Sequence, residues 1–525
     1  MKVVVIGGTG AFGSRLCDVL SRDGDEVTVA SRNAPQDTRF PHLRFDRNGP
    51  LDRLTGFDVV VDAAGPFHGY GDDPYRIAMA AIGAGAHYFD LSDNADFCAG
   101  ITTLDTQAQV AGVSVVSGMS SVPAVSSAAV TALCNGMAPL MIDAAILPGN
   151  KAPRGRSVVD SILNQTGQDY EVTQGGQPVT VRSWSDPRIY DLAGEARQAW
   201  RIEVPDQRLF PQHFDCPTVS FRAGLELGIM RYGLAVLSWL RANLRFGMPR
   251  WLVTFVMWLA RLLGPFGTDT GGMVVDVTLP ERNEFVRRTW TMTARNGDGP
   301  FTPAIAVRAA CRNLQALPSG AYPALGIVTL DQIETCFSDL DITTETSEQP
   351  IVPPFKTVLG KRFMDLDVAV RTTHDAVTPR YYEGRATVTR GKGLQARIAA
   401  TLFGFPPTGD DVLVSVSKTP SATGETWVRR FGTSVFRSYL SPTNRGMSER
   451  FGLFSFDLDL TVQDGKLNFP VKSGRCMGIP IPRALLPGSE ATEYAKDGKF
   501  HFDVHLKAPT GATLVHYRGW LMPKT

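Results

Sequence analysis

The sequence has almost no net charge and no paired cysteines. Its 53 Lys and Arg are balanced by 52 Asp and Glu, which leaves a formal net charge of +1 at pH 7. A chain with so little excess charge has no overall field that attracts nucleic acid, so we expect no nucleic-acid partner. The seven cysteines are scattered and form no C-x-x-C pair. This favours reduced thiols in the cytoplasm over a disulfide framework.

Two further motifs are missing. No tyrosine is followed four residues later by lysine. This excludes the Tyr-x-x-x-Lys pair of short-chain dehydrogenases, in which the lysine lowers the tyrosine pKa for proton transfer. No signal-peptide pattern precedes the first predicted strand. The length of 525 residues, at about 100–200 residues per domain, indicates about three domains.

The clearest pattern that is present lies in the first 32 residues. An apolar run at 2–6 leads into the glycine-rich sequence GGTGAFG, then a helix-like segment, then a second strand-like run at 26–32. Glycines permit positive φ angles and let the backbone approach a pyrophosphate, and the helix N-terminus adds free N–H groups. We therefore predict a dinucleotide site that contains Gly7, Thr9, Gly10, Ala11, Phe12 and Gly13.

The end of the second predicted strand bears on the choice of cofactor. NAD sites usually place an acidic residue there to accept from the ribose 2′-OH, but this chain has Ser31, Arg32 and Asn33. The planar guanidinium of Arg32 can pair with a 2′-phosphate, with Ser31 and Asn33 as further donors. The pattern favours NADP over NAD.

Residues 1–120 alternate between strand and helix signals. Strands are predicted at 43–45, 58–62, 87–91 and 113–117, with helices at 73–85 and 96–110 between them. This alternation predicts a Rossmann-type doubly wound parallel sheet, an α/β fold whose ligands bind beyond the carboxyl ends of the strands. The candidates for proton transfer near those ends are His68, Tyr70, Tyr88 and Asp90.

Several of these motifs resemble a known family. The glycine-rich opening, the sequence DAAGPF at 62–67 and the sequence GAGAHYFDL at 83–91 are similar to the saccharopine dehydrogenase-like NADP-binding group. The stretch 299–330 resembles that group's return to the cofactor domain. The resemblance implies that Ala64, Gly65 and Pro66 contact the cofactor. It does not imply saccharopine as the substrate, because the group includes lipid-linked reductases and members of unassigned activity.

Residues 121–342 predict an α+β domain that would hold the substrate. Within it, residues 225–263 form two very apolar helical runs separated by Pro249, neither long and uncharged enough to cross a bilayer. At helical spacing Arg231, Ser238, Arg241 and Arg245 fall on one side of the first run. The pattern suits peripheral contact with a membrane, a cover over an apolar substrate pocket, or a homodimer interface.

The last third of the chain has the residue pattern of β-strands and not that of alternating strands and helices. A linker is predicted at 343–354, and residues 355–525 predict a mainly antiparallel β domain with a hairpin at Asp464-Gly465. Short helices are predicted at 394–402 and 491–496. The region resembles a domain of unknown function that is often fused behind such reductases. His501, Asp503 and His505 share one face of a predicted strand, but we interpret them as a polar surface and predict no metal site.

The sequence leaves two functions open. The first is an NADP-dependent oxidoreductase that moves a hydride between the nicotinamide and an apolar or lipid-like small molecule. The second is a non-catalytic NADP-binding scaffold or sensor whose C-terminal β domain binds a ligand or a protein. The intact glycine turn favours the first function, and the lack of a clear acid–base motif favours the second.

Overall fold

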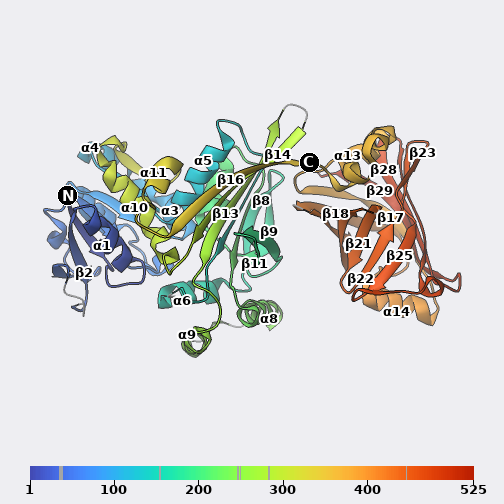
Figure 1. Ribbon diagram of the computed structural model, residues 1–525, viewed down its shortest axis with the longest axis horizontal. Coiled ribbons are helices and arrows are strands. Elements are labelled where there is room, and N and C mark those ends of the chain that lie inside the picture. Colours follow the sequence, from blue (N-terminus) through green and yellow to red (C-terminus); the bar gives the residue numbers. More distant parts are fainter. Residues whose placement is uncertain are drawn as a thin grey trace. The chain divides into compact units, whose positions relative to one another are not determined.

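The computed structural model describes residues 1–34, 39–152, 155–244, 247–248, 250–281, 284–421, 423–444 and 446–524. These residues form two compact units. Unit 1 comprises Met1–Pro280 and Val286–Gln349, and unit 2 comprises Glu281–Phe285 and Pro350–Thr525. Figure 1 shows the chain coloured from blue at the N-terminus to red at the C-terminus.

Unit 1 begins with a seven-stranded parallel sheet of the order β15-β6-β5-β4-β1-β2-β3. Its strands are β1 (Lys2–Ile6), β2 (Glu26–Ser31), β3 (His42–Arg44), β4 (Val59–Asp62), β5 (His87–Asp90), β6 (Ser114–Ser117) and β15 (Gly320–Pro323). The strand order reverses between β1 and β4, which is where doubly wound sheets bind their ligands. The predicted Rossmann-type fold is confirmed.

Helices cover both faces of this sheet (Figure 1). They are α1 (Gly13–Arg22), α2 (Arg76–Gly83), α3 (Ala95–Gly100) and α4 (Asp105–Ala111). Helix α10 (Thr302–Arg312) packs on α1, and α11 (Leu330–Thr335) packs on α10 and on α5 (Ser126–Cys134). The single helix predicted over 96–110 is instead α3 and α4, separated by a short 3-10 turn at Ile101–Leu104. Gly100 ends α3, and glycine is a weak helix former.

The second sheet of unit 1 has the order β10-β11-β12-β7-β13-β14-β16. Its strands are β7 (Met141–Leu147), β10 (Arg188–Leu192), β11 (Glu195–Arg201), β12 (Val219–Gly224), β13 (Gly271–Glu281), β14 (Glu284–Ala294) and β16 (Ile342–Ile351). One apolar core joins the two sheets, because Val5 of β1, Ala306 of α10 and Phe221 of β12 belong to the same cluster. The cofactor-type sheet and the middle region therefore pack as one body.

The predicted linker at 343–354 is wrong for most of its length. Residues up to Ile351 form β16, the strand at one edge of the second sheet. Most of its side chains are exposed. An edge strand that is solvated in this way carries no apolar alternation, so its sequence gave no strand signal.

Smaller elements complete unit 1. They are α6 (Arg156–Gln165), α7 (Pro205–His213), α8 (Gly228–Leu244), α9 (Arg250–Leu263) and the hairpin β8 (Asp169–Gln174) with β9 (Gln177–Arg182). Helix α6 packs against α9 through a cluster that contains Val159, Leu163 and Val253. The predicted apolar hairpin at 225–263 therefore forms two helices, and one of them rests on α6.

Unit 2 is built on a thirteen-stranded antiparallel sheet. Its strands are β17 (Arg380–Arg390), β18 (Gly409–Ser421), β19 (Gly424–Phe431), β20 (Ser434–Thr443), β21 (Gly446–Phe451), β22 (Phe454–Leu458), β23 (Thr461–Gln463), β24 (Lys466–Asn468), β25 (Val471–Cys476), β26 (Ile479–Pro480), β27 (Gly488–Lys496), β28 (Lys499–Lys507) and β29 (Thr513–Pro523). Its helices are α12 (Pro354–Leu359), α13 (Val368–His374) and α14 (Leu394–Phe403).

Most local predictions for this region are confirmed, and one is wrong. The hairpin at Asp464-Gly465 joins β23 to β24, and the helix predicted at 394–402 is α14. The helix predicted at 491–496 does not form, because these residues belong to β27, which pairs with β24 and β28. Their helical propensity is a weak preference that the two neighbouring strands override.

Candidate active site

The glycine turn lies at the carboxyl end of β1, where a dinucleotide pyrophosphate would bind. Gly7 has φ +78°, and a Cβ at this position would lie 2.7 Å from the Cα of Ala64. Helix α1 starts at Gly13 without a side-chain cap and without an acidic residue in its fully described first turn. The N–H of Ser14 donates to the carbonyl of Gly10, and the positive end of the α1 dipole faces the turn, which favours an anion there. Only glycine fits the close approach of the two loops.

The predicted specificity residues follow β2. Ser31 ends the strand, and its hydroxyl donates to the carbonyl oxygen of Asn33 at 2.7 Å. It also lies 3.0 Å from Nε2 of His42 on the neighbouring β3. Arg32 and Asn33 are exposed. His42 gave no signal in the sequence, because only the pairing of β2 with β3 brings it beside Ser31.

The loop after β4 is fixed by a buried carboxylate. Asp62 is 1% exposed and accepts from the backbone N–H of Ala64 at 3.0 Å and from the hydroxyl of Tyr70 at 3.1 Å. Burial raises the pKa of Asp62. Burial and the charge of Asp62 raise the pKa of Tyr70 above its usual value. Asp62 thus links Tyr70 to the backbone of Ala64, and the hydroxyl proton of Tyr70 is engaged by Asp62.

Tyr88 and Asp90 lie inside the sheet. Tyr88 is 1% exposed and packs in the apolar core. Oδ1 of Asp90 accepts from the N–H of Gly118 at 2.8 Å, from Ser117 Oγ at 3.0 Å and from the N–H of Ser92 at 3.0 Å. Burial raises the pKa of Asp90 to about 7. Asp90 therefore ties β5 to the loop after β6.

Of the four predicted proton-transfer residues, the structure places His68 in a crevice. The crevice contains about 650 Å³ of empty space, its open side included. Its sheet side is formed by His68, Asp93 and Asn94, in the loops that follow β4 and β5. Its other side is formed by Ser161, Asn164, Gln165, Gln168, Tyr170, Ser183 and Glu203. Most of these side chains are polar, so the crevice suits a polar part of a substrate.

Sequence reasoning missed Tyr170 and Glu203. Tyr170 is 9% exposed and accepts weakly from Nε2 of Gln207 at 3.4 Å. Burial raises the pKa of Tyr170 to about 12, and burial also raises the pKa of Glu203. Both residues lie more than a hundred positions from His68 in the sequence, and no local motif marks them. Only the packing of the two sheets brings them into the crevice.

In the hairpin of α8 and α9, helix α8 turns polar side chains toward the protein: Ser238 Oγ donates to the carbonyl of Ser183 at 2.9 Å. Arg241 donates to the carbonyls of Asn164 and Thr166, at 2.6 and 2.9 Å. The predicted basic stripe of the first run is therefore turned inward at Arg241, which is 8% exposed. On α9, by contrast, Thr254 and Arg261 are exposed. Pro249 and Arg245 lie outside the described residues.

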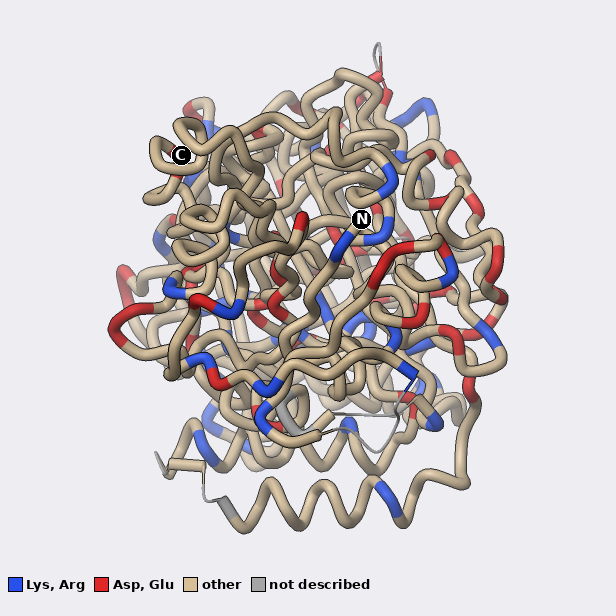
Figure 2. Tube along the Cα trace, turned by 90° about the vertical axis from the view of Figure 1, so that its left-hand side faces the viewer, with Lys and Arg blue, Asp and Glu red and all other residues tan. Residues whose placement is uncertain are grey.

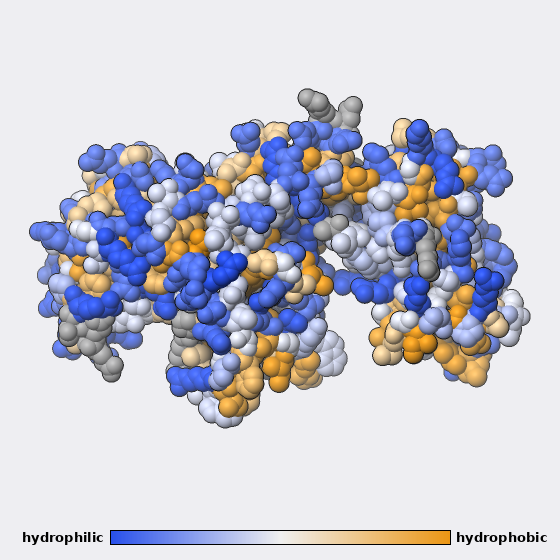
Figure 3. All heavy atoms as spheres, viewed as in Figure 1, coloured by the Kyte–Doolittle hydropathy of each residue, from blue (hydrophilic) through white to orange (hydrophobic). Residues whose placement is uncertain are grey.

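The apolar side of the same hairpin faces outward, as the orange surface at the lower edge of unit 1 shows in Figure 3. The side chains that are about half or more exposed are Ile229, Tyr232, Val236, Trp239, Leu244, Trp251, Phe255, Trp258, Leu262 and Phe266. No aspartate or glutamate occurs in residues 227–268. In Figure 2 the two lowest helices accordingly carry blue but no red. Within the described ranges, no helix has both the length and the apolar character to cross a bilayer.

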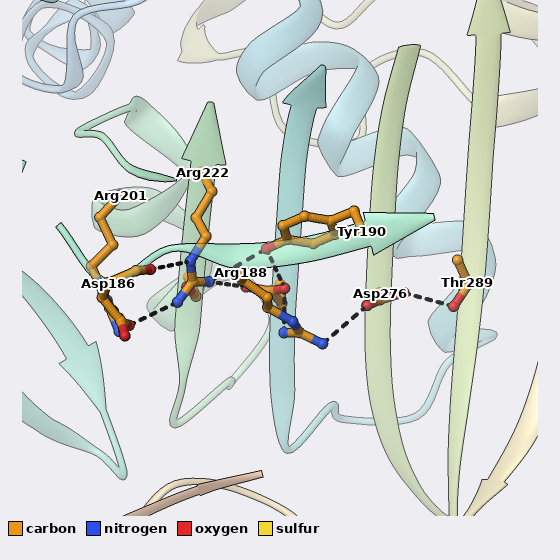
Figure 4. Close-up of polar contacts among 9 residues, drawn as sticks. Asp186, Arg188, Tyr190, Arg201, Arg222, Asp276 and Thr289 are labelled. Carbon is orange, nitrogen blue, oxygen red and sulfur yellow. Dashed lines mark hydrogen bonds and ion pairs between the residues drawn. The ribbon is translucent and has the colours of Figure 1, made fainter. Parts of the chain in front are cut away.

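A second polar cluster lies on the other sheet of unit 1 (Figure 4). Asp143 accepts from Arg222 at 2.7 Å, from Arg188 at 2.5 Å and from the hydroxyl of Tyr190 at 2.7 Å. Arg222 also donates to Asp186 at 3.0 Å. The charges of this cluster pair with one another and hold β10 over β7 and β12. We interpret it as structural, because a buried arginine without a carboxylate partner would be strongly destabilising.

Comparison with known proteins identifies one domain. Residues 366–521 match the model of a domain of unknown function, DUF4166. This confirms that the C-terminal region is similar to a domain of unknown function. No curated protein matches the chain by sequence.

Among solved structures, the chain is similar to the oxidoreductase ylbE from Lactococcus lactis, at 18% identity over 22% of this chain and 68% of that one, with a TM-score of 0.17. It is similar to a meso-DAP dehydrogenase mutant with DAP from Clostridium tetani, at 13% identity over 63% of this chain and 95% of that one, with a TM-score of 0.35.

A third similar structure is a UDP-glucose-4-epimerase with bound NAD from Stenotrophomonas maltophila, at 19% identity, with a TM-score of 0.15. The match covers 17% of this chain and 36% of that one. The chain spans less than half the length of this and several other matched proteins. With scores of this size, the likeness identifies neither a substrate nor a cofactor.

Proposed function

We propose that this protein is an NADP-dependent oxidoreductase whose substrate binds in the crevice beside His68. The observation that carries the proposal is the shared position of two features. The glycine turn and the loop at Ala64 meet at the reversal of strand order, and a polar crevice is lined by the loops that follow β4 and β5. Doubly wound sheets bind dinucleotides and substrates at this place.

The residues of the turn fit the coenzyme. At Gly7, Gly10 and Gly13 a Cβ would meet nearby backbone atoms, so the glycines let the turn fold tightly at the end of α1 that has no side-chain cap, where a pyrophosphate would bind. The residues that would hold the dinucleotide are Gly7, Thr9, Gly10, Ala11, Phe12, Gly13, Ala64, Gly65 and Pro66. When bound, the nicotinamide would supply or accept a hydride. The resemblance to the saccharopine dehydrogenase-like group supports this assignment, and saccharopine itself is not proposed as the substrate.

The preference for NADP rests on Arg32, with Ser31 and Asn33 beside it. An arginine fork can pair with the 2′-phosphate, whereas a carboxylate would repel it. We expect Arg32→Asp to weaken NADPH binding by at least about tenfold, or about 1.4 kcal/mol, and to leave NADH binding nearly unchanged. Isothermal calorimetry with both coenzymes measures this. Equal losses for the two coenzymes would contradict the NADP assignment.

The proton for the reaction would come from His68, Tyr170 or Glu203, the titratable side chains of the crevice other than Asp93. We expect one of the variants His68→Gln, Tyr170→Phe and Glu203→Gln to lower the turnover number by about 100-fold or more. Its affinity for NADPH should stay the same, because none of the three lies in the glycine turn. NADPH oxidation on enones, ketones and imines is the assay. Coenzyme binding without turnover on any class would instead support the non-catalytic scaffold or sensor.

We further propose that the α8–α9 hairpin rests on an anionic membrane surface. Its outward side chains include Trp239, Trp251 and Trp258, and tryptophan favours the membrane–water interface. A segment without acidic residues is also attracted to anionic lipid. Helix α6 lies between the hairpin and the crevice, since Val159 and Leu163 face the hairpin cluster and Asn164 and Gln165 line the crevice. A lipid-like substrate with a polar head group fits this arrangement.

Vesicle flotation tests this contact. We expect the double variant Trp239→Glu, Trp258→Glu to bind vesicles that contain anionic lipid at least about tenfold more weakly than wild type, because each carboxylate must enter the interface. Val110→Glu is the control, since Val110 is 86% exposed on α4, away from the hairpin. If wild type does not bind vesicles and sedimentation shows that the double variant turns a dimer into a monomer, the apolar side belongs to a second copy of the chain.

A further inference from the structure

The sheet of unit 2 is rolled around a cavity. β24 lies next to one end of the strand order and β25 lies next to the other, and two residues separate these strands in the chain. So short a connection spans only about 10 Å, so the two edges of the sheet must lie near each other. The enclosed space measures about 1190 Å³, its mouth included.

Most of the cavity wall is apolar, and about half of its apolar side chains are aromatic. Along β18, Val414, Val416 and Lys418 point inward and are buried, whereas Leu413 points outward and is 59% exposed. The aromatic side chains of the wall include Phe405, Phe431, Phe436, Phe456, Phe502 and Tyr517. A hollow of this size with such a lining favours an apolar occupant, because water there would have few hydrogen-bond partners.

One end of the cavity is polar, and its charges are already paired. Nζ of Lys418 donates to the carbonyl of Thr373 at 2.8 Å and lies 3.8 Å from the ring centre of Trp427. The His374 ring lies between the two charges. Its Nε2 lies 2.5 Å from the carboxylate of Glu493, and its Nδ1 lies 3.2 Å from Nζ of Lys418. At this end Lys418 and Glu493 share a neutral imidazole. The buried carboxyl of Glu425 accepts from the indole N–H of Trp427 at 2.6 Å, and burial raises the pKa of Glu425, which disfavours its charged form.

A second pair lies on the wall. Arg429 donates to Glu449 at 3.1 Å and to Ser438 Oγ at 2.7 Å, and its guanidinium stacks over Trp427. The charged side chains that line the cavity are thus Lys418 and Arg429 against Glu449 and Glu493. Their formal charges cancel. An ionised ligand would bring a charge without a partner into an apolar space, which is costly.

We propose that the cavity binds an uncharged, largely apolar molecule that carries one hydroxyl or carbonyl group, with that group at the end formed by Lys418 and Glu493. Both side chains retain capacity for a further hydrogen bond, since an ammonium has three donors and a carboxylate has about four acceptor sites. The cavity lies within unit 2, so the proposal does not depend on the coenzyme site.

Displacement of a neutral fluorescent probe, N-phenyl-1-naphthylamine, from the full-length protein tests the ligand class. Decan-1-ol, decanoate and decylammonium share one chain length and differ in charge. We expect the alcohol to displace the probe at a concentration about tenfold or more below that of either ion. If decanoate or decylammonium is as effective as the alcohol, an uncharged ligand is the wrong class.

Two matched variants locate the site. Val471 lines the cavity, and the next residue of β25, Lys472, is exposed on the outside. We expect Val471→Trp to fill the space and weaken probe binding by at least about tenfold, and Lys472→Trp to leave it unchanged. Circular dichroism checks that both variants fold. If Val471→Trp does not fold, Ser489→Trp from β27 fills the same cavity. Unchanged probe binding in the folded cavity variant would overturn the proposal.

Discussion

The crevice of unit 1 and the cavity of unit 2 differ in what lines them. The crevice of unit 1 is formed by loops and helix α6, and most of its side chains are amides, hydroxyls and carboxylates. The cavity of unit 2 is formed by alternate positions of strands, and most of its side chains are aromatic or aliphatic. A polar crevice next to a coenzyme turn suits chemistry, which needs hydrogen bonds and proton transfer. An apolar cavity with balanced charges suits the binding of a molecule that does not react there.

The buried titratable groups of the two units differ in the same way. Unit 1 buries the carboxyl groups of Asp90 and Asp206, and burial raises the pKa of each to about 7. Unit 2 buries the base His374, and burial together with Lys418 lowers its pKa to about 4. Burial disfavours the charged form in every case. The contributions of these carboxyl groups and of His374 to stability should therefore change in opposite directions with pH.

The largest effect is expected at Asp206, on α7 beside Ser126. The pKa of this carboxyl is about 7 in the folded protein and about 3.9 in the unfolded chain. Between these pH values the folded state binds a proton that the unfolded chain does not. The stability that this proton contributes is fully present below pH 4 and is lost as the pH rises to 7. The loss is about 4 kcal/mol.

Asp206→Asn cannot titrate and should remove this loss. The free energy of unfolding of the variant, relative to wild type, should rise by about 4 kcal/mol from pH 4 to pH 8. Urea unfolding, resolved for each unit by hydrogen-exchange mass spectrometry, measures it. If the free energies of unfolding of variant and wild type depend on pH in the same way, Asp206 does not cause the loss of stability.

At His374 the sign is opposite. The centre of the His374 ring lies 3.8 Å from the centre of the Phe355 ring. The pKa of His374 is about 4 in the folded protein and about 6.5 in the unfolded chain. Below pH 6.5 the unfolded chain binds the proton and the folded unit does not. Stability is thus present above pH 6.5 and falls by about 3 kcal/mol as the pH drops to 4. His374→Gln should flatten this slope in unit 2 and leave unit 1 unchanged, by the same unfolding assay.

A substitution at Gly7 should impair the coenzyme site and leave the cavity of unit 2 intact. A side chain at Gly7 would meet the backbone of Ala64, at a positive φ that β-branched residues avoid. Gly7→Val should weaken NADPH binding by about 100-fold, or about 2.7 kcal/mol. Probe binding in the cavity of unit 2 should not change. Gly83→Val is the matched control, because Gly83 has open space around it, and calorimetry should show no loss there.

The smallest effect concerns the support of the crevice. Arg241 closes the end of α6 through the carbonyls of Asn164 and Thr166. Arg241→Met should lower the free energy of unfolding by about 2 kcal/mol, since it removes charged hydrogen bonds. It should also speed hydrogen exchange over residues 163–168. Arg261→Met, on the exposed side of α9, should change neither. If exchange near the crevice is unaffected, α8 does not support it.

Some of the site could be predicted from the sequence because its signal is local. The glycine spacing after β1 and the alternation of strands and helices depend on neighbouring residues, and both predicted the Rossmann-type sheet. The apolar hairpin was also evident, but the side that it presents was not. Helical spacing shows that Arg241 and Ser238 share a side. It cannot show that the carbonyls of Ser183 and Thr166 lie on that side.

Errors arose where pairing decides the structure. Residues 491–496 have helical propensity and still form β27, and residues 343–351 lack apolar alternation and still form β16. In both cases hydrogen bonds to distant strands outweigh local preference. Tyr170 and Glu203 belong to the same class, because they reach the crevice only through the packing of two sheets.

The amino-acid order by itself determined that a strand, a glycine turn and a helix begin the chain, since these depend on contacts within about thirty residues. It also determined that the last third forms antiparallel strands. Only the tertiary structure decided which polar side chains meet His68, which way the α8–α9 hairpin faces, and that the C-terminal strands roll up around a hollow. Each of these depends on residues that are far apart in the chain and are brought together by burial of the apolar cores.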